Sequence, residues 1–215
     1  LRDLSIGQSG FAKGAALPGA ADGGGAVLVQ GGSLAVQNAK FSANLAAATG
    51  GAGGAIHGDH ARVTIDDSFF IGNAGTEGGA VALVDSRATI ENTSFTKSGR
   101  YFAQPDLGGA LFLQRSDTSI ARSSFAQNIA SDGGAIAHLG GSTTIVDSTI
   151  AGNQANRLSS AYGGGLYASG GILKLLGTTI TGNVAVARTT AHGGIAFFYA
   201  FAILFEPTAE RALVH

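Results

Sequence analysis

The sequence lacks several residue types whose absence excludes whole classes of protein. No cysteine occurs among its 215 residues, which excludes disulfides, cysteine-ligated zinc and a thiol nucleophile. Proline occurs only 3 times and glycine follows no three-residue period, so a collagen-like chain is excluded as well. Methionine is absent even at position 1, and no signal-peptide pattern is visible, so we expect a processed or truncated piece of a longer product.

Charge is scarce and balanced. The 13 lysines and arginines face 14 aspartates and glutamates, giving a formal net charge of -1. This balance offers no basic surface for nucleic acid or for an anionic membrane. The longest apolar run, Ile195 to Phe205, is shorter than the roughly twenty residues that a membrane-spanning helix needs. We therefore expect no nucleic-acid partner and no transmembrane segment.

Glycine is what the chain has in excess, with 35 residues, beside a hydrophobic content of 45% that suffices for one domain with a sizeable core. The glycines recur as pairs at intervals of 25 to 30 residues. The pairs begin at Gly24, Gly53, Gly78, Gly108, Gly133, Gly163 and Gly193. A fixed period of this length is typical of a repeat protein.

Other residue types keep the same period. Twenty residues after each of the first six glycine pairs lie five asparagines and one serine, namely Asn44, Asn73, Ser98, Asn128, Asn153 and Asn183. Large apolar residues occupy three further columns, 3, 12 and 17 residues after the start of each of the first six pairs, as in Ile136, Ile145 and Ile150. These columns are the predicted core.

The segments between the columns alternate in polarity and are rich in β-branched residues, as in TTIVDSTI at 143–150, which predicts short strands. One such repeat cannot bury its apolar face alone, but stacked repeats can. We therefore predict an all-β fold, a single-stranded parallel β-helix of about seven coils. It forms one domain over 1–215, with an N-terminal coil or cap at 1–23, six repeats at 24–192 and a degenerate terminal coil or cap at 193–215.

The glycine pairs and the asparagines are expected at corners of each coil. Glycine adopts a positive φ without steric cost, and asparagine tolerates the same left-handed conformation. Stacked asparagine amides can also hydrogen bond along the axis as a ladder. Ser98 is the rung at which this ladder should be weak.

The combination of Gly-Gly-Ala-Ile with Phe-x-x-Asn resembles the repeats of the polymorphic outer-membrane protein family, the adhesive passengers of bacterial autotransporters. The matching pieces are GGAI at 53 and 133, GGAV at 24 and 78, GGAL at 108, and FSAN, FIGN and FAQN. The later units, STIAGN and GGGLYASGGILKLLGTTITGN, are similar to repeats of choice-of-anchor Q surface proteins. The resemblance spans about 24–185, and it implies a right-handed β-helix, in line with the general preference for right-handed parallel crossovers.

The segment HGDH offers a candidate metal set in His57, Asp59 and His60. A plainer interpretation is that His60 stacks with Asp85 and Arg115, and Arg62 with Arg87 and Asp117, as ladders of alternating charge on an outer edge. The same residues also support an enzymatic alternative, a polysaccharide lyase or hydrolase acting on acidic glycans. In that alternative Arg87 or Arg115 acts as the base, and Asp85 and Asp117 hold a cation.

Aromatic residues in the longer connections are candidates for contact with a glycan or protein on a host or cell surface. The segments 99–106 and 154–162 are predicted insertions on one edge, and they carry Tyr101, Phe102 and Tyr162. These rings either fold back over the coil or offer a contact surface.

The apolar run at 195–205 either covers the last core layer or forms a seam for head-to-tail assembly, with Phe197, Phe198 and Phe201 as its seam residues. The sequence indicates no cofactor. It favours a non-catalytic structural or adhesive module, extracellular or on a bacterial cell surface, that can stack into filaments.

Overall fold

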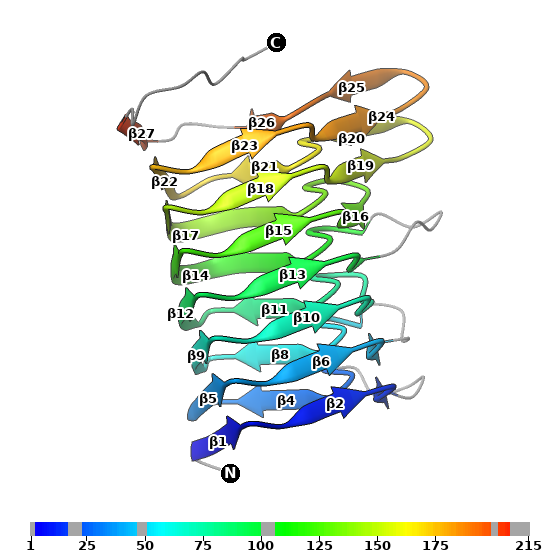
Figure 1. Ribbon diagram of the computed structural model, residues 1–215. Helices are drawn as coiled ribbons and strands as arrows, with labels where there is room; N and C mark the ends of the chain where they lie inside the picture. Colours follow the sequence, from blue (N-terminus) through cyan, green and yellow to red (C-terminus); the bar gives the residue numbers. More distant parts are fainter. Residues whose placement is uncertain (1–2, 17–22, 47–50, 100–105, 199–201, 207–215) are drawn as a thin grey trace.

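The computed structural model describes residues 3–16, 23–46, 51–99, 106–198 and 202–206, and within them every regular element is a β-strand. The chain winds as a solenoid whose levels follow one another from β1 at one end to β27 at the other (Figure 1). All strand pairs join neighbouring levels in parallel register. The predicted all-β parallel β-helix is therefore confirmed.

Two faces of the solenoid share one 13-stranded sheet, because two long strands run through the corner between them. The first face contains β4 (Val27–Gln30), β8 (Ile56–Asp59), β11 (Val81–Val84), β21 (Leu166–Ser169) and β26 (Ile195–Phe198). The second contains β1 (Asp3–Gly7), β5 (Ser33–Gln37), β9 (Arg62–Asp66), β12 (Arg87–Glu91), β22 (Ile172–Leu176) and β27 (Ala202–Glu206). The strands common to both faces are β14 (Leu111–Ala121) and β17 (Ile136–Val146).

The third face is a seven-stranded sheet with one strand from each level up to that of β23. Its strands are β2 (Gly10–Ala12), β6 (Lys40–Ser42), β10 (Phe69–Ile71), β13 (Ser94–Thr96), β15 (Ser124–Ala126), β18 (Thr149–Ala151) and β23 (Thr179–Thr181). Shorter sheets complete the circuit. They consist of β3 (Ala15–Ala16) with β7 (Leu45–Ala46), β16 (Ile129–Ala130) with β19 (Gln154–Asn156) and β24 (Val184–Val186), and β20 (Ser160–Tyr162) with β25 (Thr190–His192).

The core fills the inside of the coil with the three predicted columns. Across the middle levels these residues are fully buried, as Ile136, Ile145 and Ile150 are. Five phenylalanines of the third face stack with ring centroids 4.8 to 4.9 Å apart, and they are Phe11, Phe41, Phe70, Phe95 and Phe125. This distance equals the ordinary spacing of neighbouring strands, so the backbone register itself brings the rings into contact.

The glycine pairs make a corner in two ways. The first glycine of each of the first six pairs has a positive φ, for example 64° at Gly133. The second glycine lies against the next level, since a Cβ placed on Gly54 would come within 2.1 Å of the Gly79 carbonyl oxygen. Any larger residue at the second position would push two coils apart.

The asparagines form a buried ladder along the axis. The Asn44 amide donates to Asn73 Oδ1 at 2.9 Å, Asn128 donates to Asn153 at 2.9 Å and Asn153 donates to Asn183 at 2.8 Å. At Ser98 the hydroxyl bonds instead to the Thr96 carbonyl of its own coil at 3.3 Å. The amide chain is therefore interrupted where the serine stands.

One expectation about this corner is wrong. The ladder asparagines do not adopt the left-handed conformation; the residue before each rung does, as at Lys97 and Gln127 with φ of 53° and 56°. Asparagine is used here for its amide, which bonds to the level on each side. The sharp turn is made by its neighbour.

A hydroxyl ladder, which the sequence analysis did not predict, lines the corner between the second and third faces. Here a backbone N–H of one level donates to a serine or threonine hydroxyl of the next. The bonds run from Ala39 to Ser68, Ser68 to Thr93, Thr93 to Ser123 and Ser123 to Ser148, at 3.1 to 3.4 Å. Coil register is thus fixed by side chains at two corners besides the strands.

Two segments at the C-terminal levels form strands that extend the solenoid. The predicted insertion at 154–162 contains strands β19 and β20, which pair with β24 and β25 of the following level. The connection of the following level, at 184–192, has the same length, so the two segments can pair as strands. The apolar run at 195–205 forms β26 and β27, which pair in register with β21 and β22 and so add another level to the solenoid.

Candidate functional site

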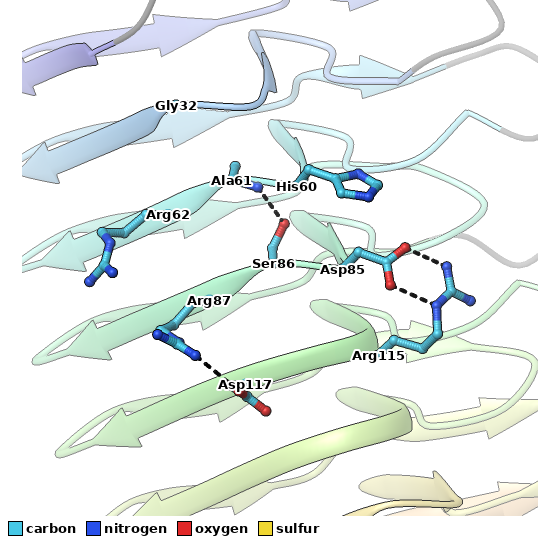
Figure 2. Close-up of a pocket in the computed structure, with 9 residues that line it drawn as sticks. All are labelled: Gly32, His60, Ala61, Arg62, Asp85, Ser86, Arg87, Arg115 and Asp117. Carbon is cyan, nitrogen blue, oxygen red and sulfur yellow. Dashed lines mark hydrogen bonds and ion pairs between the residues drawn. The ribbon is translucent and has the colours of Figure 1, made fainter.

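A groove lined by charged side chains lies outside the corner between the first and second faces. It spans several levels and has a volume of about 390 Å³. Its lining residues are Gly32, His60, Ala61, Arg62, Asp85, Ser86, Arg87, Arg115 and Asp117. Figure 2 shows two rims of charged side chains on either side of a floor of small residues.

The first rim consists of turn residues in a left-handed conformation. His60, Asp85 and Arg115 have φ of 50°, 47° and 46°, although none is glycine. On the flanking levels the same turn position is Gly31 or Gly140. Among the described residues, three consecutive levels therefore present a side chain here, and each projects outward beside the next (Figure 2).

Asp85 and Arg115 form a two-pronged ion pair on this rim. Arg115 donates from Nε to Asp85 Oδ1 at 2.7 Å and from Nη2 to Oδ2 at 2.5 Å. The hydrogen bond from Arg115 is the main reason that the pKa of Asp85 lies below its usual value, and the same bond raises the pKa of Arg115. Both side chains reach solvent, so the pair contributes little to stability.

The second rim runs along the starts of β9, β12 and the second half of β14. Arg62, Arg87 and Asp117 are direct partners in the parallel register. Arg87 lies 3.5 Å from Asp117, with both side chains more than half exposed. The predicted alternation of charge is therefore wrong at this rim, where two arginines are adjacent.

The floor is held in place by a third set of axial hydrogen bonds. The Ala61 N–H donates to Ser86 Oγ at 3.0 Å, and the Ser86 N–H donates to Ser116 Oγ at 3.1 Å. Ser86 and Ser116 are buried, and their hydroxyls bond to backbone carbonyls of their own coils. The groove thus has a hydrogen-bonded floor with exposed charged side chains along its rims.

The residues that could hold a cation differ from the predicted set. Asp59, His60 and Asp85 each offer a ligand atom, and these atoms lie within 4.8 Å of one another. His60 Nδ1 is 2.7 Å from Asp59 Oδ1. His57 lies apart from this group, because its strand position places it in the column with Ala82, which is buried against the outer face.

The four residues of the lyase alternative do meet in one groove, where Asp85 is paired with Arg115. A base must lose its proton to act, and the Asp85 carboxylate raises the pKa of Arg115. Asp85 in turn is held by Arg115 and is not free to bind a cation without breaking that pair.

The other predicted contact residues are distributed elsewhere. Tyr162 is partly buried and stacks on His192 of the next level, with ring centroids 5.4 Å apart. Tyr101, Phe102 and Phe201 lie outside the described residues. Phe197 and Phe198 belong to β26, which continues the coil, and the predicted assembly seam stays a prediction.

Sequence reasoning undervalued Arg62 and missed the floor serines. The signal was present, since DHAR at 59–62 and DSR at 85–87 align level on level and place two arginines in one column. It also missed His138, a fully buried residue inside the core whose Nδ1 is 3.0 Å from Thr143 Oγ1. Burial lowers the pKa of His138, opposed by a backbone hydrogen bond with Gly170.

Comparison with known proteins gives one match. A family model described as "Right handed beta helix region" matches residues 19–185. No curated protein and no solved structure matches the chain. None of the described residues form a helix with the length and apolar character needed to cross a membrane.

Proposed function

The chain belongs to the right-handed β-helix family, and from this premise we propose that it is a non-catalytic structural or adhesive module of a bacterial extracellular or cell-surface protein. Members of such a fold have many roles, so the proposal depends on the groove. The observation that carries it is the pairing of Arg115 with Asp85, which engages two of the residues that catalysis would need free.

The build of the rod supports a structural role. Amides and hydroxyls bond level to level at separate corners, in addition to the strand pairs. Each level contacts its two neighbours, so the solenoid forms a stiff spacer with a long lateral surface. Such a surface suits adhesion because many weak contacts can act together along it.

The repeat motifs support the proposed location. Gly-Gly-Ala-Ile with Phe-x-x-Asn resembles the polymorphic outer-membrane protein repeats, and the later units resemble choice-of-anchor Q proteins. Both are surface proteins of bacteria, and the absence of cysteine is compatible with that setting. Head-to-tail stacking into filaments is part of the same proposal, and sedimentation at rising protein concentration tests it.

A polysaccharide lyase or hydrolase is the second candidate. It is favoured by one observation, the presence of Arg87, Arg115, Asp85 and Asp117 in a single groove. A lyase acting on a uronate chain produces an unsaturated sugar that absorbs ultraviolet light, and a hydrolase produces new reducing ends.

Incubation with acidic polysaccharides, with and without calcium, separates the two candidates. We expect neither ultraviolet absorbance nor reducing ends to increase over the buffer control. Turnover that disappears in Arg115→Ala and persists in Arg188→Ala, an exposed arginine on another part of the rod, would overturn the proposal.

A further inference from the structure

Arg62 and Arg87 form an unfavourable pair within the rod itself. They are direct partners across β9 and β12, on strands about 4.8 Å apart, and like charges in this position destabilise a sheet. Arg87 has Asp117 as a partner on its other side, while Arg62 has no ion pair among the residues that the structure describes. Its other register partner is Ser33, which brings no charge.

The groove beside this pair runs over several levels of the rod. Its floor consists of Gly32, Ala61 and Ser86, so no large side chain blocks a path along the rod axis. Arg62 and Arg87 project on the same side of this floor (Figure 2). Two guanidinium groups on neighbouring strands can donate several hydrogen bonds to one oxyanion.

We propose that Arg62 and Arg87 together bind a carboxylate or sulfate group of an acidic glycan chain that lies along the groove, which rests on the proposed adhesive function and specifies its ligand. The bound anion supplies the negative charge that the column lacks at Arg62. The unfavourable pair is thereby relieved only when ligand is present.

The surroundings favour a glycan over other polyanions. Asp117 follows the two arginines on their rim and Asp85 lies on the opposite rim, so the groove suits a chain with separated anionic groups and repels the closely spaced phosphates of nucleic acid. A peptide strand has no edge to join here, because β9 and β12 are hydrogen bonded to neighbours on both sides. The recognition is therefore by charge and hydrogen bonding along an open surface.

Calorimetric titration of the whole chain tests the proposal with three probes, a short oligogalacturonate, a sulfated heparin fragment and an uncharged maltooligosaccharide. We expect at least one acidic probe to bind, more weakly as salt is added, and the uncharged probe not to bind. Comparing the two acidic probes tells whether carboxylate or sulfate is preferred. Arg62→Gln should weaken binding by about 10- to 100-fold, as expected for loss of one charge-assisted contact.

Two variants separate binding from folding. Arg188→Gln removes an exposed arginine elsewhere and should leave the affinity unchanged. Arg62→Glu should abolish binding while the thermal midpoint stays the same or rises, because the glutamate can pair with Arg87. A purely structural Arg62 would not give this combination of effects.

Several results would overturn the inference. They are no binding of either acidic glycan, equal losses in Arg62→Gln and Arg188→Gln, or stronger binding of polyglutamate or DNA than of both glycans. Cleavage of the bound oligosaccharide would instead overturn the non-catalytic proposal and leave the role of Arg62 in binding intact. The failure of one proposal is thus distinguishable from the failure of the other.

Discussion

Two corners of the same coil solve the problem of stacking in opposite ways. At the asparagine corner the polar groups are buried and uncharged, and the bonding pattern of Asn128 repeats at Asn153. At the charged corner the side chains are exposed and change from level to level, from His60 to Asp85 to Arg115. The first corner is uniform, and the second is variable.

The difference follows from solvation. A buried amide without partners keeps the full cost of losing water, so the asparagine column tolerates few changes. An exposed charge that loses its partner is solvated by water, so the charged column is free to vary. The uniform corner therefore maintains the rod, while the variable corner is available for recognition.

The largest effect is expected from Asn128→Ala. This amide donates to the Phe95 carbonyl and to Asn153 Oδ1, and its Oδ1 accepts the Ser98 N–H. Its removal leaves buried groups unpaired and should lower the free energy of unfolding by about 1 to 3 kcal/mol. Denaturant titration measures the loss, and Asn156→Ala on β19 is the control with a half-buried amide. Equal, negligible changes in the free energy of unfolding of both variants would show that the asparagine ladder does not stabilise the rod.

The buried His138 should make the core sensitive to acid. Because burial lowers its pKa in the folded state, the unfolded chain binds the proton more readily once the pH falls below about the ordinary value of 6.5. Stability is therefore complete above that pH and decreases below it, by at most about 1.4 kcal/mol per pH unit. Thermal melts of the protein and of His138→Leu at pH 7 and pH 5 isolate the effect; a parallel decrease in both would contradict it.

Ser98→Asn should make the hydrogen bonding at the asparagine corner continuous. The new amide fills the interrupted rung between Asn73 and Asn128, so we expect a change between zero and about 1 kcal/mol in favour of the folded state. Ser98→Ala removes the hydroxyl without adding an amide and serves as the matched control. Destabilisation by Ser98→Asn would mean that the buried site lacks room for the larger side chain.

The smallest change in stability is expected at the charged corner. Arg115→Ala should leave the melting temperature nearly unchanged, because the Asp85 pair is solvent exposed. The pKa of Asp85, however, should rise towards its ordinary value of 3.8, since the hydrogen bond from Arg115 is what lowers it. Carbon NMR of the Asp85 carboxyl group follows this titration, and an unchanged pKa would show that the pair does not persist in solution.

The sequence was sufficient for the fold because the period involves several residue types at once. Glycine pairs, three apolar columns and asparagines all had to fall in register, and only stacked coils satisfy them together. The hydroxyl ladder could not be predicted from the sequence, because serine and threonine are also common on exposed strand faces. Only the backbone geometry shows that Ser68 and Ser123 turn inward at a corner.

The groove was less predictable than the fold. Repeat alignment brought Asp85 to Arg115 and Arg62 to Arg87, but it does not give the direction of a side chain at a left-handed turn. His57 shares the outer face of β8 with Asp59, but it is buried in the column with Ala82 and is not part of the group formed by Asp59, His60 and Asp85. The direction of these side chains depends on the backbone conformation of single turn residues, which the repeat period does not reveal.

The two ends of the described chain, β1 and β27, lie at opposite ends of the solenoid (Figure 1). A pulling force applied through them acts along the axis, which is the direction of the hydrogen bonds between levels. Because each level contacts only its neighbours, the load detaches one coil at a time from an end. Each released coil adds 25 to 30 residues of slack chain. Under tension the molecule would therefore lengthen in steps, and each step would dissipate part of the mechanical work.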